Sequence, residues 1–261
     1  MTVRATARRL LETVSGRRVK TIDPGAVAFI DPQKRHSDWF SYDLVLQRLL
    51  TLNRIDLVVD VGANEGQFAR RVRRTYSGPI MSFEPVAATF DRLSRAAAQD
   101  PHWSVHQLAL GSADGTAEIH VASDTSFSSL LNANDFSRKR FRQSVVQSRQ
   151  VVDVKRLDEV LEPLMAAEPD TRLFVKLDTQ GYDLEAFAGL GAYVDLVMIV
   201  QSELSLIPIY DGMPHWTHSV SVYEAAGFAV AGMFPVNHDS VGRVIEYDTL
   251  LVRAQPNITQ V

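Results

Sequence analysis

The residues with the clearest chemical meaning lie at positions 57–68, where an apolar run ends in Asp60 and a glycine-spaced turn follows. Gly62 and Gly66 bracket this turn, and Asn64 stands between them. Glycine adopts backbone conformations that are closed to other residues, and asparagine tolerates the left-handed region better than most. In a parallel α/β sheet, such a stretch brings a strand end, a tight turn and a helix N-terminus to an adenosine-bearing ligand.

The glycines that this turn lacks narrow the choice of ligand. A dinucleotide-binding fingerprint requires G-x-G-x-x-G, and Asn64 and Gln67 occupy its second and third glycine positions here. The phosphate-binding pattern G-x-x-x-x-G-K followed by Ser or Thr does not occur in the chain. A short glycine turn after an acidic residue suits an adenosine cofactor without a pyrophosphate, and S-adenosylmethionine fits that description.

A second acidic residue follows at a suitable distance. Residues 79–83 form a mainly apolar run that ends at Glu84 and Pro85, and Glu84 comes 24 residues after Asp60. An acidic side chain at this strand end can accept hydrogen bonds from both ribose hydroxyls, and its expected spacing is about 20 residues. Proline cannot continue the strand pairing. We therefore expect Glu84 to contact the cofactor rather than to be a surface carboxylate.

The composition is that of a globular chain that can bury a full core. Its 261 residues are 46% hydrophobic and 22% charged. The absence of cysteine excludes disulfides, thiolate metal sites and cysteine nucleophiles, and it fits a reducing compartment. No apolar run approaches the roughly 18–20 residues that span a bilayer, and no signal-peptide pattern opens the chain. We expect a cytoplasmic protein, and its net charge of -4 argues against nucleic acid as a partner.

Basic residues gather in two segments. Residues 1–20 hold six arginines and lysines against the single acid Glu12, and residues 138–142 hold four basic residues. Both segments can be solvated faces without a partner. The alternative is a weak attraction to an anionic membrane or an acidic substrate, and it predicts peripheral membrane association through the basic N-terminus.

Strand-like and helix-like segments alternate from about residue 55 to residue 252. The predicted strands lie near 55–61, 79–84, 103–109, 172–178, 194–201, 228–234 and 244–252, and the predicted helices near 66–75, 86–98, 183–190 and 216–226. This alternation builds a mostly parallel α/β sheet with helices on both faces. Residues 235–243 resemble a loop, so the last two strands should pair antiparallel.

The connection before the fourth predicted strand is too long for one crossover. It holds short strand patterns at 117–121 and 151–154, a helix-like stretch at 157–161 and a polar stretch at 123–150. Long connections in compact domains are usually functional, so we expect the polar stretch to form a lid over the cofactor end of the sheet. Residues 1–52 are expected to add N-terminal helices. With no linker or repeat, the prediction is a single domain over 1–261 with its core at 55–252.

Five segments together resemble the FkbM family of S-adenosylmethionine-dependent O-methyltransferases, and the likeness extends over about residues 55–252. The segments are Val59–Gly66, Phe83–Pro85, Ala109–Gly111, Leu157–Leu161 and Val175–Glu185. Seven strands with an antiparallel last strand form the Rossmann-like architecture of class I methyltransferases. The resemblance implies methyl transfer to a hydroxyl of a sugar, glycolipid or polyketide-type natural product.

Position at the carboxyl edge of the sheet, together with the resemblance, assigns roles in cofactor binding. Asp60 is expected to bind the amino group of the methionine moiety, directly or through water, and Glu84 to hold the ribose. Leu110 is expected either to cover the adenine or to belong to the core, and the serines of segment 125–130 either to contact ligand or to be ordinary loop serines. The full predicted cofactor set is Asp60, Gly62, Ala63, Asn64, Gln67, Phe68, Glu84, Pro85, Ala109, Leu110 and Ser128.

Methyl transfer to a hydroxyl requires alignment of the reacting atoms and a route for the proton. Asp178, at the end of the fourth predicted strand, is the first candidate for a catalytic or acceptor-orienting role, and a helix N-cap is its alternative. Lys176 is expected to be structural or ion-paired. The further candidate bases are Glu203 after the fifth strand and the loop histidines His215, His218 and His238.

A divalent metal is an open question. Asp178 and Glu203 carry oxygen atoms of the kind that Mg²⁺ prefers, but two scattered carboxylates do not make a site. The family pattern D-x-E-G has an acid at the position of Gln180, and the neutral amide here weakens the case for a metal. We leave the metal unassigned.

Two other classes of function remain alternatives. A non-catalytic module could retain the cofactor pocket and use the basic N-terminus to dock on a partner or membrane. A nicotinamide-dependent oxidoreductase is disfavoured by the missing glycines. Binding of S-adenosylmethionine without turnover would indicate the first, and preference for NAD the second. The acceptor molecule and the oligomeric state do not follow from the sequence.

Overall fold

The computed structural model describes residues 18–23, 26–30 and 42–254. The chain divides into two compact units, residues 1–45 and 46–261, and each is described by itself. The single methyltransferase domain expected over residues 1–261 stays a prediction. Among the described residues, no helix has the length and apolar character needed to cross a membrane.

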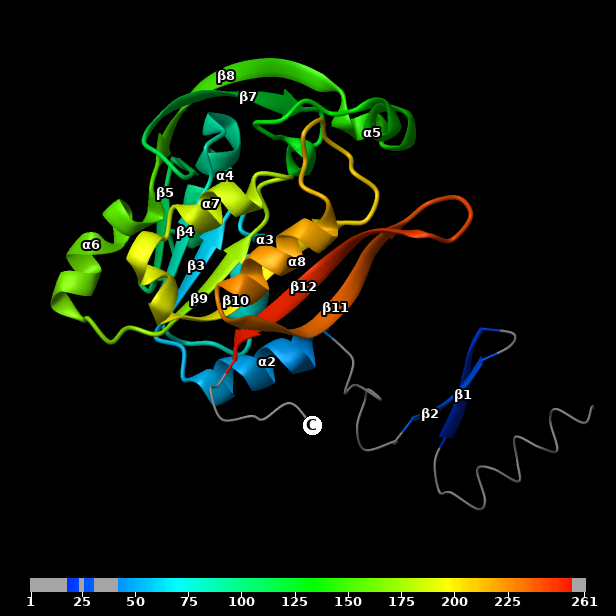
Figure 1. The fold of residues 1–261 in the computed structure, drawn as a ribbon, viewed down its shortest axis with the longest axis horizontal. Helices are drawn as coiled ribbons and strands as arrows, with labels where there is room; N and C mark the ends of the chain where they lie inside the picture. The colour runs from blue at the N-terminus through cyan, green and yellow to red at the C-terminus, as the bar shows by residue number, and fades with distance from the viewer. Residues whose placement is uncertain (1–17, 24–25, 31–41, 255–261) are drawn as a thin grey trace, which may run out of the picture. The chain divides into compact units, whose positions relative to one another are not determined.

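The first unit contains a hairpin of two antiparallel strands, β1 (Arg18–Asp23) and β2 (Ala26–Ile30) (Figure 1). The sequence predicted only helices for the N-terminal region, so the hairpin is a correction. Both strand segments are rich in β-branched residues, and the Pro24-Gly25 pair between them is a turn signal that the prediction overlooked. Helix α2 (Tyr42–Asn53) follows. Residues 1–17 of the basic N-terminal segment lie outside the described residues.

The second unit is built on a seven-stranded sheet in the order β11-β12-β10-β9-β3-β4-β5 (Figure 1). Strand β12 runs antiparallel to β10 and β11, and the other neighbouring strands pair parallel. The predicted fold class is therefore confirmed. The strands are β3 (Leu57–Val61), β4 (Ile80–Phe83), β5 (Trp103–His106), β9 (Leu173–Leu177), β10 (Val197–Ser205), β11 (Phe228–His238) and β12 (Val244–Arg253).

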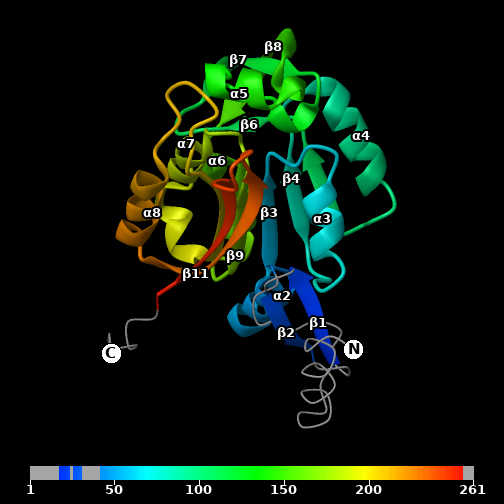
Figure 2. The same ribbon diagram turned by 90° about the vertical axis from the view of Figure 1, so that its right-hand side faces the viewer.

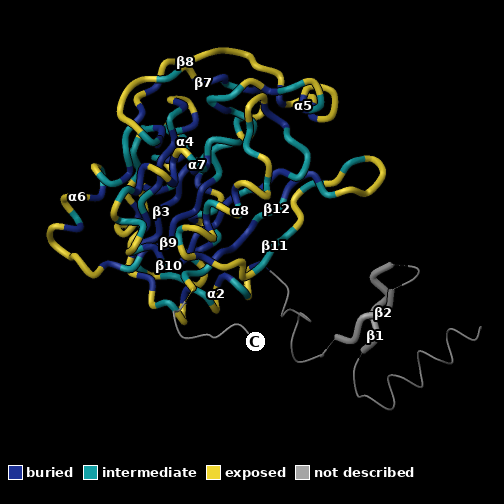
Figure 3. Tube along the Cα trace, viewed as in Figure 1, coloured by how far each residue is buried: buried dark blue, intermediate teal, exposed yellow. Residues whose placement is uncertain are grey.

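Helices cover both faces of this sheet. Figure 2 shows α3 and α4 on one side and α6, α7 and α8 on the other. Every residue of β3 and β9 is buried, as expected for central strands of a parallel sheet covered on both faces, and Figure 3 shows this core in dark blue. The helices are α3 (Gln67–Val72), α4 (Ala87–Ala97), α6 (Leu157–Ala167), α7 (Asp183–Ala188) and α8 (Trp216–Ala225).

The long insertion forms a second, three-stranded sheet in the order β6-β8-β7. Figure 2 shows this sheet and α5 above the ends of β3 and β4, where the lid was predicted. The position brings the insertion to the carboxyl edge of the main sheet. Its elements are β6 (Ala109–Leu110), β7 (Gly115–Ala122), η1 (Thr125–Phe127), α5 (Asp135–Arg140), η2 (Arg142–Ser144) and β8 (Val146–Lys155).

Two predicted strand boundaries are wrong. The third predicted strand, 103–109, stops at His106, because Ala109 leaves the main sheet and pairs with Val154 of β8. The predicted loop 235–243 belongs in part to β11, which continues to His238. Register shifts on either side of Asn237 accommodate Pro235 in this edge strand, since proline cannot donate to a regular ladder.

Candidate functional site

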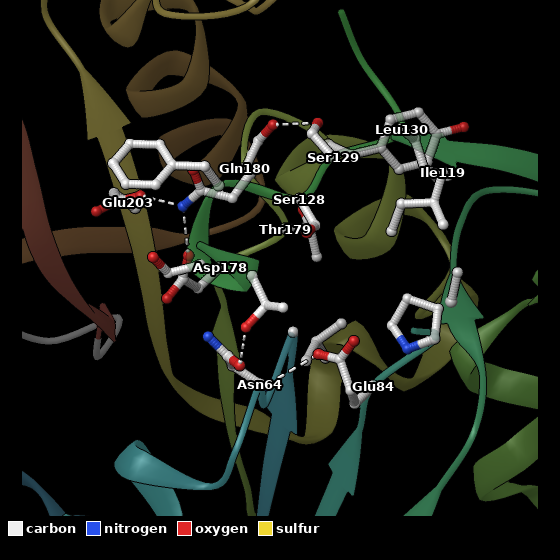
Figure 4. Close-up of a pocket in the computed structure, with 18 of the residues that line it drawn as sticks. Asn64, Glu84, Ile119, Ser128, Ser129, Leu130, Asp178, Thr179, Gln180 and Glu203 are labelled. Atoms are coloured by element: carbon white, nitrogen blue, oxygen red, sulfur yellow. Dashed lines mark hydrogen bonds between the residues drawn. The ribbon is translucent and has the colours of Figure 1, made fainter. Parts of the chain in front are cut away.

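A cavity of about 250 Å³ lies at the carboxyl edge of the main sheet and beneath the insertion. Its walls come from the ends of β3, β4, β9 and β10, from β6 and β7, from segment 125–130 and from the β11–β12 hairpin. Figure 4 shows Glu84 and Ile119 on one side of the cavity and Asp178, Gln180 and Glu203 on the other. Nine of the predicted site residues line it: Gly62, Asn64, Glu84, Pro85, Ala109, Leu110, Ser128, Asp178 and Glu203.

The glycine turn after β3 has the predicted conformation. Gly62 and Asn64 have φ angles of 72° and 48°, both in the left-handed region. A Cβ atom on Gly62 would lie 2.0 Å from the backbone oxygen of Asp178, so the turn packs directly against the end of β9. Any side chain at this position would force the two strand ends apart.

Glu84 is buried beside this turn. Its Oε2 accepts a hydrogen bond from the backbone N–H of Asn64 at 3.0 Å, and its Oε1 accepts one from Val86 at 2.9 Å. Burial raises the pKa of Glu84 to about 7, and the hydrogen bonds from these two donors only partly oppose that rise. Each carboxylate oxygen can accept a second hydrogen bond, so Glu84 can still receive the hydroxyls of a ribose.

The cavity wall near Glu84 is apolar. Pro85, Ala109 and Leu110 were predicted to contact the cofactor, and Leu110 is buried both in the cavity wall and in the main core. Ile119 and Leu130 complete the wall and were missed by the sequence reasoning. The strand pattern at 117–121 carried a signal for Ile119, but nothing local indicated which side of that strand would face a ligand. The wall can hold a flat, weakly polar ring such as adenine.

The serine-rich segment 125–130 joins the insertion to the rest of the site. The Thr125 hydroxyl donates to Oδ1 of Asn64 at 3.0 Å, and the Ser129 hydroxyl donates to the backbone oxygen of Gln180 at 2.7 Å. Ser128 accepts a hydrogen bond from the backbone of Ala122, which leaves its own hydroxyl hydrogen for another partner. These contacts hold the segment across the cavity from the strand ends.

An ion-pair network centred on the buried Lys176 adjoins the cavity. The Lys176 Nζ is 3.2 Å from Oδ1 of Asp60 and 3.2 Å from Oδ2 of Asp178, and it donates to the backbone oxygen of Gly62 at 3.1 Å. Burial lowers the pKa of Lys176, but the two carboxylates outweigh it and raise the pKa overall. Burial raises the pKa of Asp60 against the opposing effect of Lys176. Asp60 is fully buried and does not line the cavity, and its partners are Lys176 and the Ser82 hydroxyl, which donates to its Oδ2 at 3.3 Å.

Asp178 and Glu203 meet through a glutamine at the other end of the cavity. The Gln180 Nε2 donates to Oδ1 of Asp178 at 3.0 Å and to Oε2 of Glu203 at 2.8 Å. Burial, followed by the charges of Asp178 and Glu246, raises the pKa of Glu203 well above its usual range. The hydroxyl of Tyr210 donates to Oε1 of Gln180 at 2.7 Å. Sequence reasoning selected the two carboxylates but missed the side chains that connect them.

The β11–β12 hairpin adds a third carboxylate that sequence reasoning missed. Glu246 is buried, lines the cavity, and accepts hydrogen bonds from Asn237 at 2.9 Å and Ser205 at 3.2 Å. Burial is the main cause that raises the pKa of Glu246. Its place in the strand pattern of β12 gave no signal of a site, because the antiparallel pairing with β10 is what brings it to the cavity.

Four predicted site residues, besides Asp60, lie outside the cavity wall. The ring of Phe68 packs 5.6 Å from the Lys176 ammonium, and Gln67 accepts a hydrogen bond from the backbone of Glu65. Ala63 is buried. His215 is exposed, and its ring nitrogen caps the N-terminus of α8. His218 and His238 are also exposed, so the structure brings no predicted histidine into the cavity wall.

The side chains of the site fit an adenosine cofactor. Within the described residues, no group of three or more His, Cys, Asp or Glu side chains is arranged to hold a metal ion. The glycine turn, the Glu84 carboxylate and the apolar wall fit the adenosine part of S-adenosylmethionine. The acidic end of the cavity fits its positively charged groups.

Comparison with known proteins gives a family match. The profile of the family described as Methyltransferase FkbM domain matches residues 60–247. Comparison with curated proteins gives no significant match.

Similar solved structures include several methyltransferases, at low sequence identity. A precorrin-6y C5,15-methyltransferase from Geobacter metallireducens is 12% identical, with a TM-score of 0.42 over 85% of this chain and 94% of that one. A magnesium protoporphyrin IX methyltransferase from Synechocystis, solved with bound SAM, is 10% identical, with a TM-score of 0.43 over 81% and 77%. A SAM-dependent methyltransferase from Aquifex aeolicus is 10% identical, with a TM-score of 0.40 over 82% and 90%.

Proposed function

This chain belongs to the FkbM family of methyltransferases, and on that premise we propose that it is an S-adenosylmethionine-dependent O-methyltransferase whose acceptor is a hydroxyl of a sugar, glycolipid or polyketide-type natural product. The observation that carries the proposal is one cavity with two chemically different ends. Glu84 and the glycine turn form one end, and the carboxylates of Asp178 and Glu203 form the other.

The first end binds the adenosine part of the cofactor. Glu84 accepts hydrogen bonds from the ribose hydroxyls, and the wall of Pro85, Leu110 and Ile119 encloses the adenine. When bound, S-adenosylmethionine supplies a methyl group on a positively charged sulfur. The acceptor oxygen would take the methyl group, and the sulfur would leave from the opposite side as a neutral thioether. The chain must therefore hold the acceptor hydroxyl on the side of the methyl group opposite the sulfur.

The second end receives the acceptor hydroxyl and its proton. Asp178 is already engaged on both oxygens, by Lys176 and by Gln180, and so it orients the acceptor. The Oε2 of Glu203 accepts a hydrogen bond from Gln180. The Oε1 of Glu203 makes no hydrogen bond to any side chain or backbone group of the described residues. Burial raises the pKa of Glu203, so its carboxylate is a stronger base than an exposed one. As the new oxygen–methyl bond forms, the hydroxyl proton moves to Glu203 and later leaves to solvent.

The acidic character of this end also favours a class of acceptor. The carboxylates of Asp178, Glu203 and Glu246 can accept hydrogen bonds from several hydroxyls, whereas they repel an acceptor that carries its own negative charge. Neutral polyhydroxylated acceptors therefore fit better than phosphorylated or carboxylated ones. We also propose that the protein is cytoplasmic and associates peripherally with membranes.

Two measurements test it. Calorimetric titration should show binding of S-adenosylmethionine and S-adenosylhomocysteine, with NAD as the control, in buffers with and without Mg²⁺. Incubation with S-adenosylmethionine carrying a labelled methyl group and a panel of neutral and acidic glycosides should then label oxygen atoms of the neutral ones. Binding without transfer to any hydroxyl would favour the non-catalytic module, and binding of NAD alone would favour an oxidoreductase.

A further inference from the structure

We propose that Gln180 is a positioning residue, whose side-chain amide holds the Asp178 and Glu203 carboxylates at the acceptor end of the cavity and keeps Glu203 ready to accept a proton. This inference rests on the proposed function for its catalytic meaning. The arrangement itself is visible in the contacts of one side chain with groups from three separate parts of the chain.

The amide nitrogen supplies what two facing carboxylates lack. Ionised carboxylates accept hydrogen bonds but have none to donate, and they repel each other. The two hydrogens of Gln180 Nε2 point to Oδ1 of Asp178 and Oε2 of Glu203, at 3.0 Å and 2.8 Å. Asp178 follows β9 and Glu203 belongs to β10, so this single group fixes the spacing of carboxylates on neighbouring strands.

The orientation of the amide is set by its surroundings. Tyr210 is buried, and the nearer of the two acceptors of its hydroxyl is Oε1 of Gln180 at 2.7 Å, the other being the backbone oxygen of Phe127 at 3.1 Å. The reverse orientation would place Oε1 against the two carboxylates, which is electrostatically unfavourable. The backbone of Gln180 has a φ angle of 55°. It is held in place by the Ser129 hydroxyl, which donates a hydrogen bond to the Gln180 carbonyl oxygen at 2.7 Å. A non-glycine residue in this left-handed conformation carries strain that surrounding contacts must offset.

Glu203 depends on this donor because the groups around it are acidic. Burial raises its pKa most, followed by the carboxylates of Asp178 after β9, Glu246 and Asp248 on β12, and Asp183 on α7. Tyr210 is a further titratable neighbour. Lys176, the nearby cation, pairs with Asp60 and Asp178 instead. The hydrogen bond from Gln180 favours the ionised form of Glu203, so its loss should make Glu203 hold a proton at higher pH.

Three substitutions separate positioning from a merely structural role. Gln180→Met keeps the length of the side chain and removes both donated hydrogens. Gln180→Glu keeps the shape and puts a carboxylate between those of Asp178 and Glu203. Tyr210→Phe leaves Gln180 in place and removes the hydroxyl that orients its amide. The matched control is Gln147→Met, since Gln147 is an exposed residue of β8 away from the cavity wall.

The first readout is the pH dependence of kcat/KM for methyl transfer. Gln180→Met should lower kcat about 100-fold and move the acidic limb of the profile upward by about 1–2 pH units, the size expected for losing a hydrogen bond to a charged group. Gln180→Glu should move the limb further, and Tyr210→Phe less. Affinity for S-adenosylmethionine should stay within about threefold. A fall in kcat that is equal at all pH values in both Gln180→Met and Tyr210→Phe would overturn the proposal.

The second readout does not need methyl transfer. Carboxyl-carbon NMR of protein labelled at glutamate, with Glu203→Gln for assignment, reports the titration midpoint of Glu203 directly. The midpoint should rise in Gln180→Met and stay unchanged in Gln147→Met. An unchanged midpoint would overturn the role of Gln180 even in an active enzyme. A raised midpoint in a protein that transfers no methyl group would support the positioning role of Gln180 and reject the proposed function.

Discussion

The hydroxyl of Thr125 donates a 3.0 Å hydrogen bond to the side-chain oxygen of Asn64, and so connects the insertion to the glycine turn. The two residues are 61 positions apart in the chain. Thr125 belongs to the η1 turn that follows β7, and Asn64 belongs to the turn after β3. Because both residues line the cavity, this bond joins the cover of the site to its cofactor end.

Loss of this bond should weaken cofactor binding. Thr125→Val keeps the shape of the side chain and removes a hydrogen bond worth about 0.5–1.5 kcal/mol, so the Kd for S-adenosylmethionine should rise about two- to tenfold. Calorimetry measures the change, and Thr116→Val at an exposed position of β7 is the control. Equal affinity of the Thr125 variant and wild type would mean that the bond does not close the site over the cofactor.

Cofactor affinity should depend on the ionisation of Glu84. Burial raises the pKa of Glu84 to about 7 in the free protein, and ribose hydroxyls donate best to the ionised form. Below pH 7 the carboxylate must lose its proton to bind, so the Kd for S-adenosylmethionine should rise toward about tenfold for each pH unit. Glu84→Gln should bind about 1–3 kcal/mol more weakly and lose this dependence. A wild-type Kd that is constant between about pH 6 and pH 8 would contradict the ribose assignment.

Lys176 should contribute strongly to stability. Its removal in Lys176→Met would leave the fully buried Asp60 without its counter-charge, which costs about 3–5 kcal/mol of unfolding free energy. Urea unfolding measures the loss, and Lys139→Met at an exposed position of α5 should change stability by less than about 0.5 kcal/mol. Asp60→Asn in the Lys176→Met background should recover part of the loss. A double variant no more stable than the single one would show that Asp60 is not the group left uncompensated.

Turnover should depend on Glu203 and not on His215. Glu203→Gln removes the proposed proton acceptor and should lower kcat by about 10²–10⁴-fold while the affinity for S-adenosylmethionine is retained. His215→Ala should leave kcat unchanged, because this exposed side chain caps α8 and does not reach the cavity wall. Steady-state kinetics at several pH values decides between the two. A large loss of kcat in His215→Ala would require a conformation in which the α8 N-terminus moves to the site.

The local pattern of the sequence was enough to bring Gly62, Asn64 and Glu84 together in the cavity wall, but not to show that Asp60 is buried outside it. Asp60, Gly62, Asn64 and Glu84 lie within a strand–turn–helix–strand unit, and their positions follow from the strand period and from the backbone freedom of one glycine. Parallel strands present their carboxyl ends at one edge, so residues that follow two such strands meet without further information. The seven-strand sheet was also predictable from local patterns. Its central strands, β3 and β9, are buried along their whole length and are therefore strongly apolar.

Only the tertiary structure decided how the acceptor end is assembled. Gln180 meets Glu203 and Tyr210, and Glu246 reaches the cavity, through contacts between segments that are far apart in the chain. The same holds for Ile119, whose strand pairs with β8 in a separate sheet, and for the bulged course of β11 at Pro235. Polar side chains of this kind carry no periodic signal of their own. Their roles depend on which hydrogen-bond partners the packed sheet places beside them, and packing is a property of the whole chain.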